Sequence, residues 1–521
     1  MINKISDKKF NLILLTIVVI SILPRLIFID QNLLDIQPFR QTQTAITVWT
    51  YTQDGFNFFN YQTPIFGPPY QAPFELPVFQ ATAYLFIKLG ISNIEIACRL
   101  TNIIFFLICC FFIVSVCSKI FKNRLITSLA LIHFCFLPFS ICWSRNVTIE
   151  YCSIAFCLFY VYAFLKLLNV NGLKKYLFLI LITVIGCLAY SIKLTTAFPY
   201  VIIVFTFFGI EIIKHLSTIK NDTFFNVIFS KKTFEYIIYS GFIFIVPIIA
   251  MYLWVRHTDL LKMQSSFSYI TTSSSLRIWN FGTWEDKTNF SNWHIIFERI
   301  GFAILPFTLV GLTFLTTFKK STRHLYVRFL FLISVVFITI FTFFNLYFEH
   351  DYYLVALLPI FSVLFAIGVY LSYEFFKFNK LKISKYINIA AISMGLIIPF
   401  SLTKGMTFSK EYLRFSYTKN KNDDYPQYLV GKRIQALTKK SDAIIITDFE
   451  WSSEMMYYAK RKGLMWTLGN ENEIGRFEKD LARTQYKFIV SKNPELYPNL
   501  FSKFEICKKI SFNEYTIFYL K

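Results

Sequence analysis

The sequence predicts an all-α, polytopic membrane protein with a small α/β domain at its C-terminal end. Hydrophobic residues make up 55% of the 521 residues, which is more than a soluble domain hides in one core. Apolar runs long enough to cross a bilayer recur up to about residue 402, and a charged sequence of ordinary soluble composition follows. We therefore expect a transmembrane domain over residues 1–402 and a soluble domain over residues 403–521.

Eleven apolar runs predict membrane spans, because a helix of about 20 apolar residues crosses a bilayer. The first run follows Lys4, Lys8 and Lys9 and lacks a small-residue cleavage site, so we interpret it as a retained signal anchor. The predicted spans cover residues 11–29, 93–118, 125–142, 148–168, 176–191, 195–213, 236–255, 299–317, 326–346, 353–373 and 387–402.

The distribution of Lys and Arg predicts the orientation of these spans. Connections rich in these residues stay in the cytoplasm, and an odd number of spans then places the C-terminal domain outside. We expect a multi-pass protein of the inner, cytoplasmic cell membrane with a cytoplasmic N-terminus. The same bias accounts for the formal net charge of +22 without nucleic acid as a partner. The basic connections are residues 119–124, 166–175, 214–232, 319–328 and 377–385.

Rare ionisable residues at the span ends collect on the predicted outer face, which includes the loops 31–92 and 256–298. Exposing such a residue to lipid costs on the order of 3 kcal/mol, so these residues predict a polar cavity that opens outward. No glycine-rich nucleotide motif occurs on the cytoplasmic side, so the substrate should come from outside or from the membrane. The outer-face residues are Asp35, Arg40, Glu75, Glu95, Arg99, Arg145, Glu150, Lys193, Arg256, His257, Glu349, His350 and Asp351.

The C-terminal region alternates strand and helix patterns. The apolar run 442–448 and the run 486–490 predict strands, and residues 451–461 have helical spacing. Nine of the ten cysteines fall in apolar segments, and no disulfide framework or zinc spacing is present. We expect no cofactor, although the sequence neither requires nor excludes a divalent metal.

Several motifs in a fixed order resemble the GT-C fold glycosyltransferases that use lipid-linked sugars, in particular the protein O-mannosyltransferase-like and aminoarabinose-transferase-like group. Relatives often have Trp where Phe39 stands and Asp where Gln43 stands, which leaves metal use and acceptor type open. The motifs are Asp35, then Phe39-Arg40-Gln41 with Thr44-Ala45, Glu75-Leu76-Pro77 with Gln80, Ser144-Arg145-Asn146 with Glu150, Lys193, and His350-Asp351-Tyr352-Tyr353-Leu354 with Pro359.

The resemblance implies an inverting transfer from a polyprenyl-phosphate sugar donor to a glycan, lipid or protein acceptor at the outer face. In that reaction Asp35 is the expected base, because a carboxylate can accept the proton of an acceptor hydroxyl. Cations are expected to stabilise the departing phosphate, and the candidates are Lys193, Arg256 and Arg145. Further expected substrate contacts are Arg40, Glu75, Glu150, His350, Asp351 and Tyr352.

Other interpretations of the same residues remain. A transporter or flippase for lipid-linked sugars would place charges through the bundle midplane and break its helices. An oligosaccharide polymerase or ligase would perform similar chemistry with another donor, and a non-catalytic sugar-binding protein would not depend on Asp35. Basic residues such as Lys193 and Arg256 can also serve only as snorkelling side chains. Glu95 and Arg99, four residues apart, predict an ion pair on one helix face.

Overall fold

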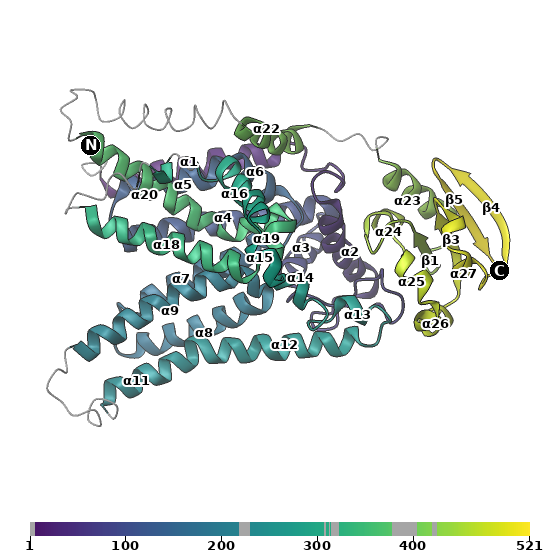
Figure 1. Ribbon diagram of the computed structural model, residues 1–521, viewed down its shortest axis with the longest axis horizontal. Coiled ribbons are helices and arrows are strands. Elements are labelled where there is room, and N and C mark those ends of the chain that lie inside the picture. Colours follow the sequence, from purple (N-terminus) through teal and green to yellow (C-terminus); the bar gives the residue numbers. More distant parts are fainter. Residues whose placement is uncertain are drawn as a thin grey trace.

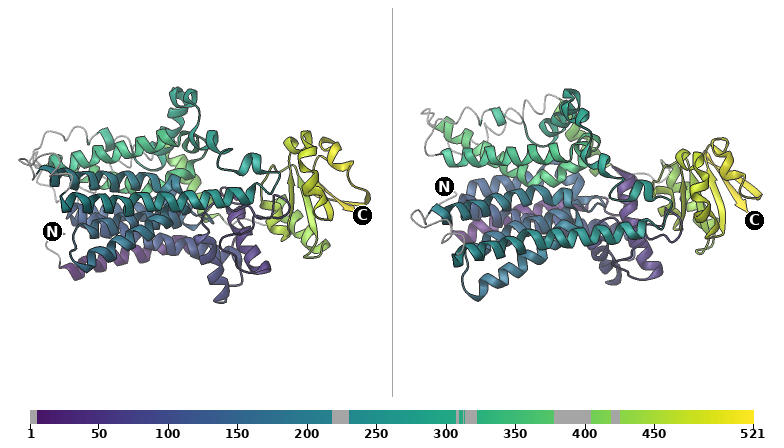
Figure 2. Two further views of the ribbon diagram at one scale, coloured as in Figure 1. Left: turned by 90° about the horizontal axis from the view of Figure 1, so that it is seen from below. Right: turned by 60° about the horizontal axis from the view of Figure 1, so that its bottom comes forward.

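A computed structural model of the protein describes residues 6–217, 230–306, 309–311, 313, 322–377, 404–418 and 425–521. Long helices lie side by side in a bundle, and a small sheet with its own helices lies at one end of it (Figures 1 and 2). The first helix begins at the opposite end (Figure 1). The prediction of a multi-pass, helical membrane protein with a small C-terminal α/β unit is confirmed.

Eight helical segments within the described residues are long and apolar enough to span a membrane. Each coincides with one of the predicted spans. The predicted span 387–402 lies outside the described residues, and the span 299–317 is described only in part. The eight segments are Asp7–Leu26, Ile94–Phe121, Glu150–Leu167, Leu173–Ile192, Leu194–Ser217, Lys232–Lys262, Arg323–Thr342 and Asp351–Glu374.

The predicted span 125–142 corresponds to two helices that are together apolar enough to cross a membrane but are separated by a sharp bend. α5 (Arg124–Phe136) and α6 (Pro138–Arg145) meet at a bend of 59°. Proline lacks a backbone N–H and disfavours helical geometry in the residue before it. Leu137 accordingly has an extended conformation, with φ −60° and ψ 129°. The bend carries the end of α6 toward α1, where Arg25 Nε donates to Ser144 Oγ at 2.6 Å.

Side-chain caps mark the starts of two of the long helices. Asn93 begins α4 by accepting a hydrogen bond from the Ile96 N–H, and Ser6 caps α1 in the same way. The helices are α1 (Asp7–Leu26), α4 (Ile94–Phe121), α7 (Glu150–Leu167), α8 (Leu173–Ile192), α9 (Leu194–Ser217), α11 (Lys231–Ser240), η2 (Gly241–Ile245), α12 (Val246–Lys262), α13 (Ser268–Thr271), α14 (Arg277–Phe281), α15 (Trp284–Thr288), α16 (Phe290–Ala303), α18 (Arg323–Thr342), α19 (Phe344–Glu349), η4 (Asp351–Leu357), α20 (Leu358–Lys377) and α22 (Lys404–Tyr417).

The segment between α1 and α4 holds two short helices, α2 (Pro38–Asp54) and α3 (Val78–Lys88). Proline at the first position suits a helix start, where the missing N–H would have no partner. The Gln37 carbonyl accepts from the N–H groups of Arg40 and Gln41. At the other end Gly55 has a φ of 90°, a conformation that glycine adopts without strain and that stops the helix.

The C-terminal sheet has the order β2-β1-β3-β5-β4, with β2, β1 and β3 parallel and β5 antiparallel to both β3 and β4. The two predicted strands are confirmed as β1 and β3, whereas the predicted helix 451–461 is shorter. The strands are β1 (Ala443–Thr447), β2 (Gly463–Trp466), β3 (Tyr486–Ser491), β4 (Ile506–Phe512) and β5 (Tyr515–Leu520); the helices are α23 (Pro426–Leu437), α24 (Glu454–Ala459), α25 (Leu468–Asn472), α26 (Ile474–Ala482), η6 (Pro494–Leu496) and α27 (Pro498–Phe501).

α22, which precedes this sheet in the chain, packs against α6 and α16 of the bundle. The Tyr412 hydroxyl on α22 donates to Asp351 at the start of η4. The expected division between residues 402 and 403 stays a prediction, and the helices and strands of the sheet unit begin with α23.

The edge strand β2 pairs with the segment between α2 and α3. The Gly67 N–H donates to the Gly463 carbonyl at 3.0 Å, and the Met465 N–H donates to the Ile65 carbonyl at 2.9 Å. Pairing of this kind covers the polar edge of a sheet. The sheet therefore holds the α2–α3 segment against the end of the bundle.

Gly463→Ala should disrupt this docking, because the added Cβ would lie 1.9 Å from the Ile444 carbonyl oxygen. We expect a loss of at least about 1–3 kcal/mol of stability, read as a lower thermal unfolding temperature in detergent. Gly469→Ala is the matched control, since its nearest neighbour is 3.5 Å away. Equal unfolding temperatures for the two variants would contradict the close packing at Gly463.

Candidate functional site

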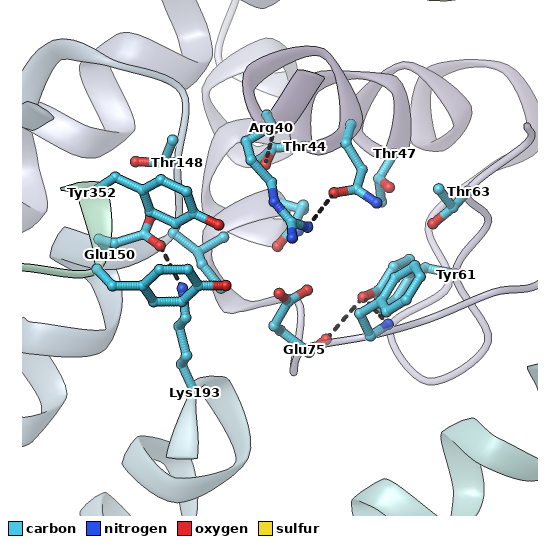
Figure 3. A pocket seen from close by; sticks show the side chains of 15 residues that line it. Arg40, Thr44, Thr47, Tyr61, Thr63, Glu75, Thr148, Glu150, Lys193 and Tyr352 are labelled. Carbon is cyan, nitrogen blue, oxygen red and sulfur yellow. Dashed lines mark hydrogen bonds and ion pairs between the residues drawn. The ribbon is translucent and has the colours of Figure 1, made fainter. Parts of the chain in front are cut away.

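A polar pocket lies where α2 meets the ends of the bundle helices (Figure 3). It contains about 560 Å³ of empty space, including space that is open to solvent. It is lined by α2, the segment between α2 and α3, α3 itself, the start of α7 with the residues before it, the α8–α9 junction and η4. The lining residues are Arg40, Gln43, Thr44, Thr47, Tyr61, Thr63, Phe74, Glu75, Gln80, Thr148, Ile149, Glu150, Lys193, Tyr352 and Tyr353.

α2 presents one face to this polar pocket, because residues three and four apart lie on the same side of a helix. Arg40, Gln43, Thr44 and Thr47 have this spacing. Arg40 Nη1 donates to Gln43 Oε1 at 2.9 Å, and its guanidinium points toward the Glu75 carboxylate (Figure 3). Burial acts to lower the pKa of Arg40, but nearby tyrosines and Glu75 raise it above its ordinary value. Arg40 is therefore a permanent cation in the pocket.

Lys193 supplies the second cation. It occupies the break between α8 and α9, and its Nζ lies 2.5 Å from Glu150 Oε1 at the start of α7. The same Nζ lies 4.6 Å from the centre of the Tyr353 ring. Burial lowers the pKa of Lys193, but Glu150 and Tyr353 outweigh it and raise the pKa overall. The amine is therefore charged, and Glu150 balances its charge.

Glu75 is placed differently from Glu150. Tyr61 fixes its backbone, since the Tyr61 hydroxyl donates to the Glu75 carbonyl at 3.0 Å and accepts from the Phe74 N–H at 2.7 Å. The carboxylate itself makes no hydrogen bond or ion pair with any residue that the structure describes. It points into the pocket below Arg40 (Figure 3). Glu75 is thus a carboxylate with free lone pairs beside two cations.

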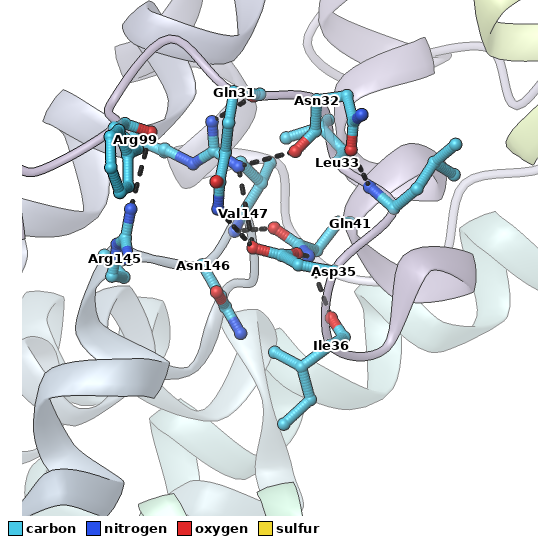
Figure 4. Close-up of polar contacts among 12 residues, drawn as sticks. Gln31, Asn32, Leu33, Asp35, Ile36, Gln41, Arg99, Arg145, Asn146 and Val147 are labelled. Atoms are coloured by element: carbon cyan, nitrogen blue, oxygen red, sulfur yellow. Dashed lines mark hydrogen bonds and ion pairs between the residues drawn. The ribbon is translucent and has the colours of Figure 1, made fainter. Parts of the chain in front are cut away.

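Asp35 lies three residues before the start of α2 and is not part of the polar pocket lining. Figure 4 shows its polar contacts. Its side chain is 4% exposed, and it accepts hydrogen bonds from Gln31 Nε2 at 3.0 Å and from Gln41 Nε2. Arg99 Nη2 on α4 lies 3.9 Å from its Oδ2. Gln41 Oε1 in turn accepts from the Val147 N–H at 3.0 Å. Asp35 therefore joins the start of α2 to α4 and to the chain before α7.

The predicted Glu95–Arg99 ion pair is not formed. Arg99 instead donates to the carbonyls of Gln31 and Asn32 and faces Asp35. Glu95 accepts a hydrogen bond of 2.8 Å from the Tyr457 hydroxyl on α24. Partners distant in the chain replace the neighbour four residues away, because both side chains lie at an interface between elements.

Other predicted contacts lie outside the pocket lining. Arg145 is buried and donates to the Ile27 carbonyl at 2.5 Å, whereas Arg256 is exposed on α12. His350 packs on the Tyr352 ring, with the ring centres 5.3 Å apart. Burial and the nearby cations lower the pKa of His350 to about 4, so it is neutral at pH 7. Asp351 accepts from Tyr412, as described above.

The polar pocket thus brings together five of the ten predicted site residues: Arg40, Glu75, Glu150, Lys193 and Tyr352. Asp35, Arg145, Arg256, His350 and Asp351 lie elsewhere. Among the lining residues without a predicted role are Thr47, Tyr61 and Tyr353. The spacing along α2 could have identified Thr47. Among the residues that the structure describes, no group of three or more His, Cys, Asp or Glu side chains is placed to hold a metal ion.

No family model matches the sequence, and no curated protein sequence matches it. The chain is similar in structure to ArnT from Cupriavidus metallidurans bound to undecaprenyl phosphate, with a TM-score of 0.56, 10% identity and coverage of 97% of each chain. It is also similar to the oligosaccharyltransferase AglB from Archaeoglobus fulgidus in complex with an inhibitory peptide and a dolichol-phosphate. That match has a TM-score of 0.53 and 10% identity, and it covers 92% of this chain and 70% of the other. These similarities show the GT-C fold that the sequence predicts.

Asp35→Asn should lower the stability of the protein, because Arg99 loses its facing charge and an amide N–H₂ replaces an oxygen that accepts from glutamine. A buried hydrogen-bonding group that is left without a partner lowers the free energy of unfolding by about 1–3 kcal/mol. Thermal unfolding in detergent measures the effect. Asp54→Asn at the other end of α2 is the control, since Asp54 is partly exposed in its pair with Lys462 and such pairs contribute about 0–1 kcal/mol. An Asp35→Asn protein as stable as wild type would show that the network does not fix α2.

Proposed function

We propose that the protein is a glycosyltransferase that moves a sugar from a polyprenyl-phosphate donor to an acceptor hydroxyl in the polar pocket. The observation that supports this most strongly is the arrangement of a free carboxylate, Glu75, opposite two cations, Arg40 and Lys193, in one pocket of a GT-C fold. Binding of undecaprenyl or dolichol phosphate by the structural neighbours fits the same reaction class.

The two cations bind the donor phosphate in this proposal. Arg40 offers a planar fork of donors that suits phosphate oxygens, and Lys193 adds a compact charge. As the bond from the anomeric carbon to the phosphate oxygen breaks, negative charge grows on the phosphate. Fixed cations in a poorly solvated pocket stabilise that charge strongly.

Glu75 acts as the base. The acceptor oxygen forms its bond to the anomeric carbon from the side opposite the phosphate, its proton passes to the Glu75 carboxylate, and the phosphate leaves with the electron pair of the broken bond. This step inverts the anomeric carbon. A carboxylate that lines the pocket and has free lone pairs suits the task. Asp35, the base expected from the sequence, then serves as a positioning residue for α2; its direct role in catalysis stays a prediction that the activity test below addresses.

The isoprenoid tail of the donor lies in an apolar groove between the spans. This groove contains about 670 Å³ of empty space between α4, α7, α9, α18 and α20. Of these helices, α7 begins with Glu150 of the polar pocket, and α9 and α20 follow its lining residues Lys193 and Tyr353 in the chain. Tyr200 in the groove is seven residues after Lys193, which corresponds to about 10 Å along α9. Groove residues include Ile113, Val116, Leu158, Val161, Tyr200, Ile203, Phe331, Ile360 and Val363.

The pocket end of the bundle faces outward in this proposal. The basic connections expected in the cytoplasm include residues 119–124 and 166–175, which lie at the C-terminal ends of α4 and α7, at the bundle end away from the sheet (Figure 1). Donor, acceptor and the C-terminal sheet then lie together on the outer side of the cell membrane.

Lys193→Met should weaken binding of undecaprenyl phosphate about 10- to 150-fold, since a charge-assisted contact to phosphate is worth about 1.5–3 kcal/mol. Binding is measured by native mass spectrometry of the purified protein. In Lys193→Met the Glu150 carboxylate loses its partner, and the double variant Lys193→Met/Glu150→Gln removes that unpaired charge. Binding of undecaprenyl phosphate should remain weak in the double variant. Arg256→Ala is the comparison, because the sequence analysis expects Arg256 to contact the phosphate and the proposed site does not include it. Loss of this exposed side chain should leave binding of undecaprenyl phosphate unchanged. Weak binding in Arg256→Ala with normal binding in Lys193→Met would move the phosphate site to α12.

Glu75→Gln should lower sugar transfer about 10²- to 10⁴-fold, the usual contribution of a general base, because the amide cannot accept the proton. Transfer is read from the mass of the surface glycoconjugate that each variant restores in cells lacking the protein. Undecaprenyl phosphate should still bind. Asp35→Asn is compared at equal amounts of folded protein. Full transfer by Glu75→Gln together with severe loss in Asp35→Asn would assign the base to Asp35.

A further inference from the structure

A second pocket lies next to the polar pocket, along the following turns of α2. It contains about 340 Å³ of empty space and opens to solvent. Tyr61 lines both pockets. The second pocket is lined by Thr50, Tyr51, Asp54, Gly55, Asn57, Asn60, Tyr61, Gln62 and Gln71.

α2 connects the two pockets. Thr47 lines the polar pocket, and Thr50, Tyr51 and Asp54 line the second one at spacings of three and four residues. These positions continue the same face of the helix. With a rise of about 1.5 Å per residue, Thr50 lies about 5 Å further along the axis than Thr47. The two pockets therefore lie beside consecutive turns of one face of α2.

The lining of the second pocket presents no unbalanced charge. Of the described residues that line it, Asp54 is the charged one, and its Oδ2 lies 2.6 Å from Lys462 Nζ. The remaining polar groups are amides and hydroxyls. Asn60 Oδ1 lies 2.9 Å from His257 Nε2, which fixes the amide orientation. Such a lining favours an uncharged ligand that forms many hydrogen bonds over a phosphate or a carboxylate.

Two residues that line this pocket each carry a buried polar atom with no hydrogen-bond partner among the described residues: the Tyr51 hydroxyl and Gln62 Oε1. Tyr51 is 2% exposed. Buried polar groups in native proteins nearly always have a partner. The hydroxyls of a saccharide both donate and accept hydrogen bonds, so one saccharide can form hydrogen bonds with a tyrosine hydroxyl and with an amide oxygen.

We propose that the second pocket binds the acceptor, and that the acceptor is a neutral, hydroxyl-rich saccharide. This inference rests on the proposed function and names the class of its acceptor. The saccharide lies along α2, and the hydroxyl that receives the new sugar passes Tyr61 to reach Glu75. Tyr61 lines both pockets and its hydroxyl donates to the Glu75 carbonyl, so the residue that the two pockets share also fixes the backbone of the base.

The test uses saccharides from cells that lack the protein, because unmodified acceptor accumulates there. Oligosaccharides released from the surface glycans are separated into a neutral and an acidic fraction by anion exchange. Native mass spectrometry of the full-length protein in detergent then reports binding of each fraction. Undecaprenyl phosphate is measured in parallel.

The neutral fraction should bind to the wild-type protein. Gln62→Ala and Gln71→Ala should each weaken this binding about 2- to 10-fold, which is the effect of one lost hydrogen bond. Gln53→Ala is the matched control. It also replaces a glutamine by alanine, but Gln53 is an exposed residue of α2 and does not line the second pocket. All three variants should bind undecaprenyl phosphate as wild type does.

Binding of the acidic fraction alone, binding of neither fraction, or equal binding of the neutral fraction by Gln62→Ala, Gln71→Ala and wild type would overturn the inference. A synthetic peptide mixture that competes with the neutral fraction would do so as well. These failures differ from failure of the proposed function. If undecaprenyl phosphate binds and the neutral fraction does not, only the acceptor class is wrong. If undecaprenyl phosphate itself does not bind, the proposed donor is wrong.

Discussion

The hydrogen bonds of the Asp35 carboxylate hold the start of α2, and both pockets depend on the position of that helix. Gln31 and Gln41 donate to Asp35, and Arg99 faces it from α4. In a poorly solvated interior such a network is stable only when its members stay paired. It therefore restrains α2 to one position relative to the spans. The position of α2 determines where its pocket-lining residues, from Arg40 to Asp54, lie.

The C-terminal sheet restrains the same region from the other side. Its edge strand β2 pairs with the chain between α2 and α3, which leads to Glu75. Trp451, in the loop after β1, packs edge-on against Phe39 with the ring centres 4.7 Å apart. Ser453 Oγ lies 2.9 Å from Thr42 Oγ1 on α2. The C-terminal sheet unit thus holds the chain that leads to Glu75, the base that we propose, and the helix that carries Arg40.

The sequence predicts the spans and half of the candidate site well, because both depend on local patterns. Apolar run length marks the helices, Lys193 stands out as a charge at a span end, and Arg40 and Glu75 stand in motifs of the first outer loop. The environment of Asp35 depends on Arg99, a partner from another element, so no local pattern indicates that the acid is buried. The uncharged residues of the second pocket carry no signal until α2 is placed beside the loop that follows it. The selection of a saccharide that we propose for them is a property of the fold.

The central claim is that one pocket holds the donor phosphate between Arg40 and Lys193 while the isoprenoid tail follows the apolar groove. An experimental structure of the protein with undecaprenyl phosphate, determined in a lipid nanodisc, tests it most directly. The account predicts phosphate density within hydrogen-bond distance of the Arg40 guanidinium and the Lys193 amine, with tail density beside Tyr200. Phosphate density at Arg256 on α12, or a tail bound away from α9, would contradict it.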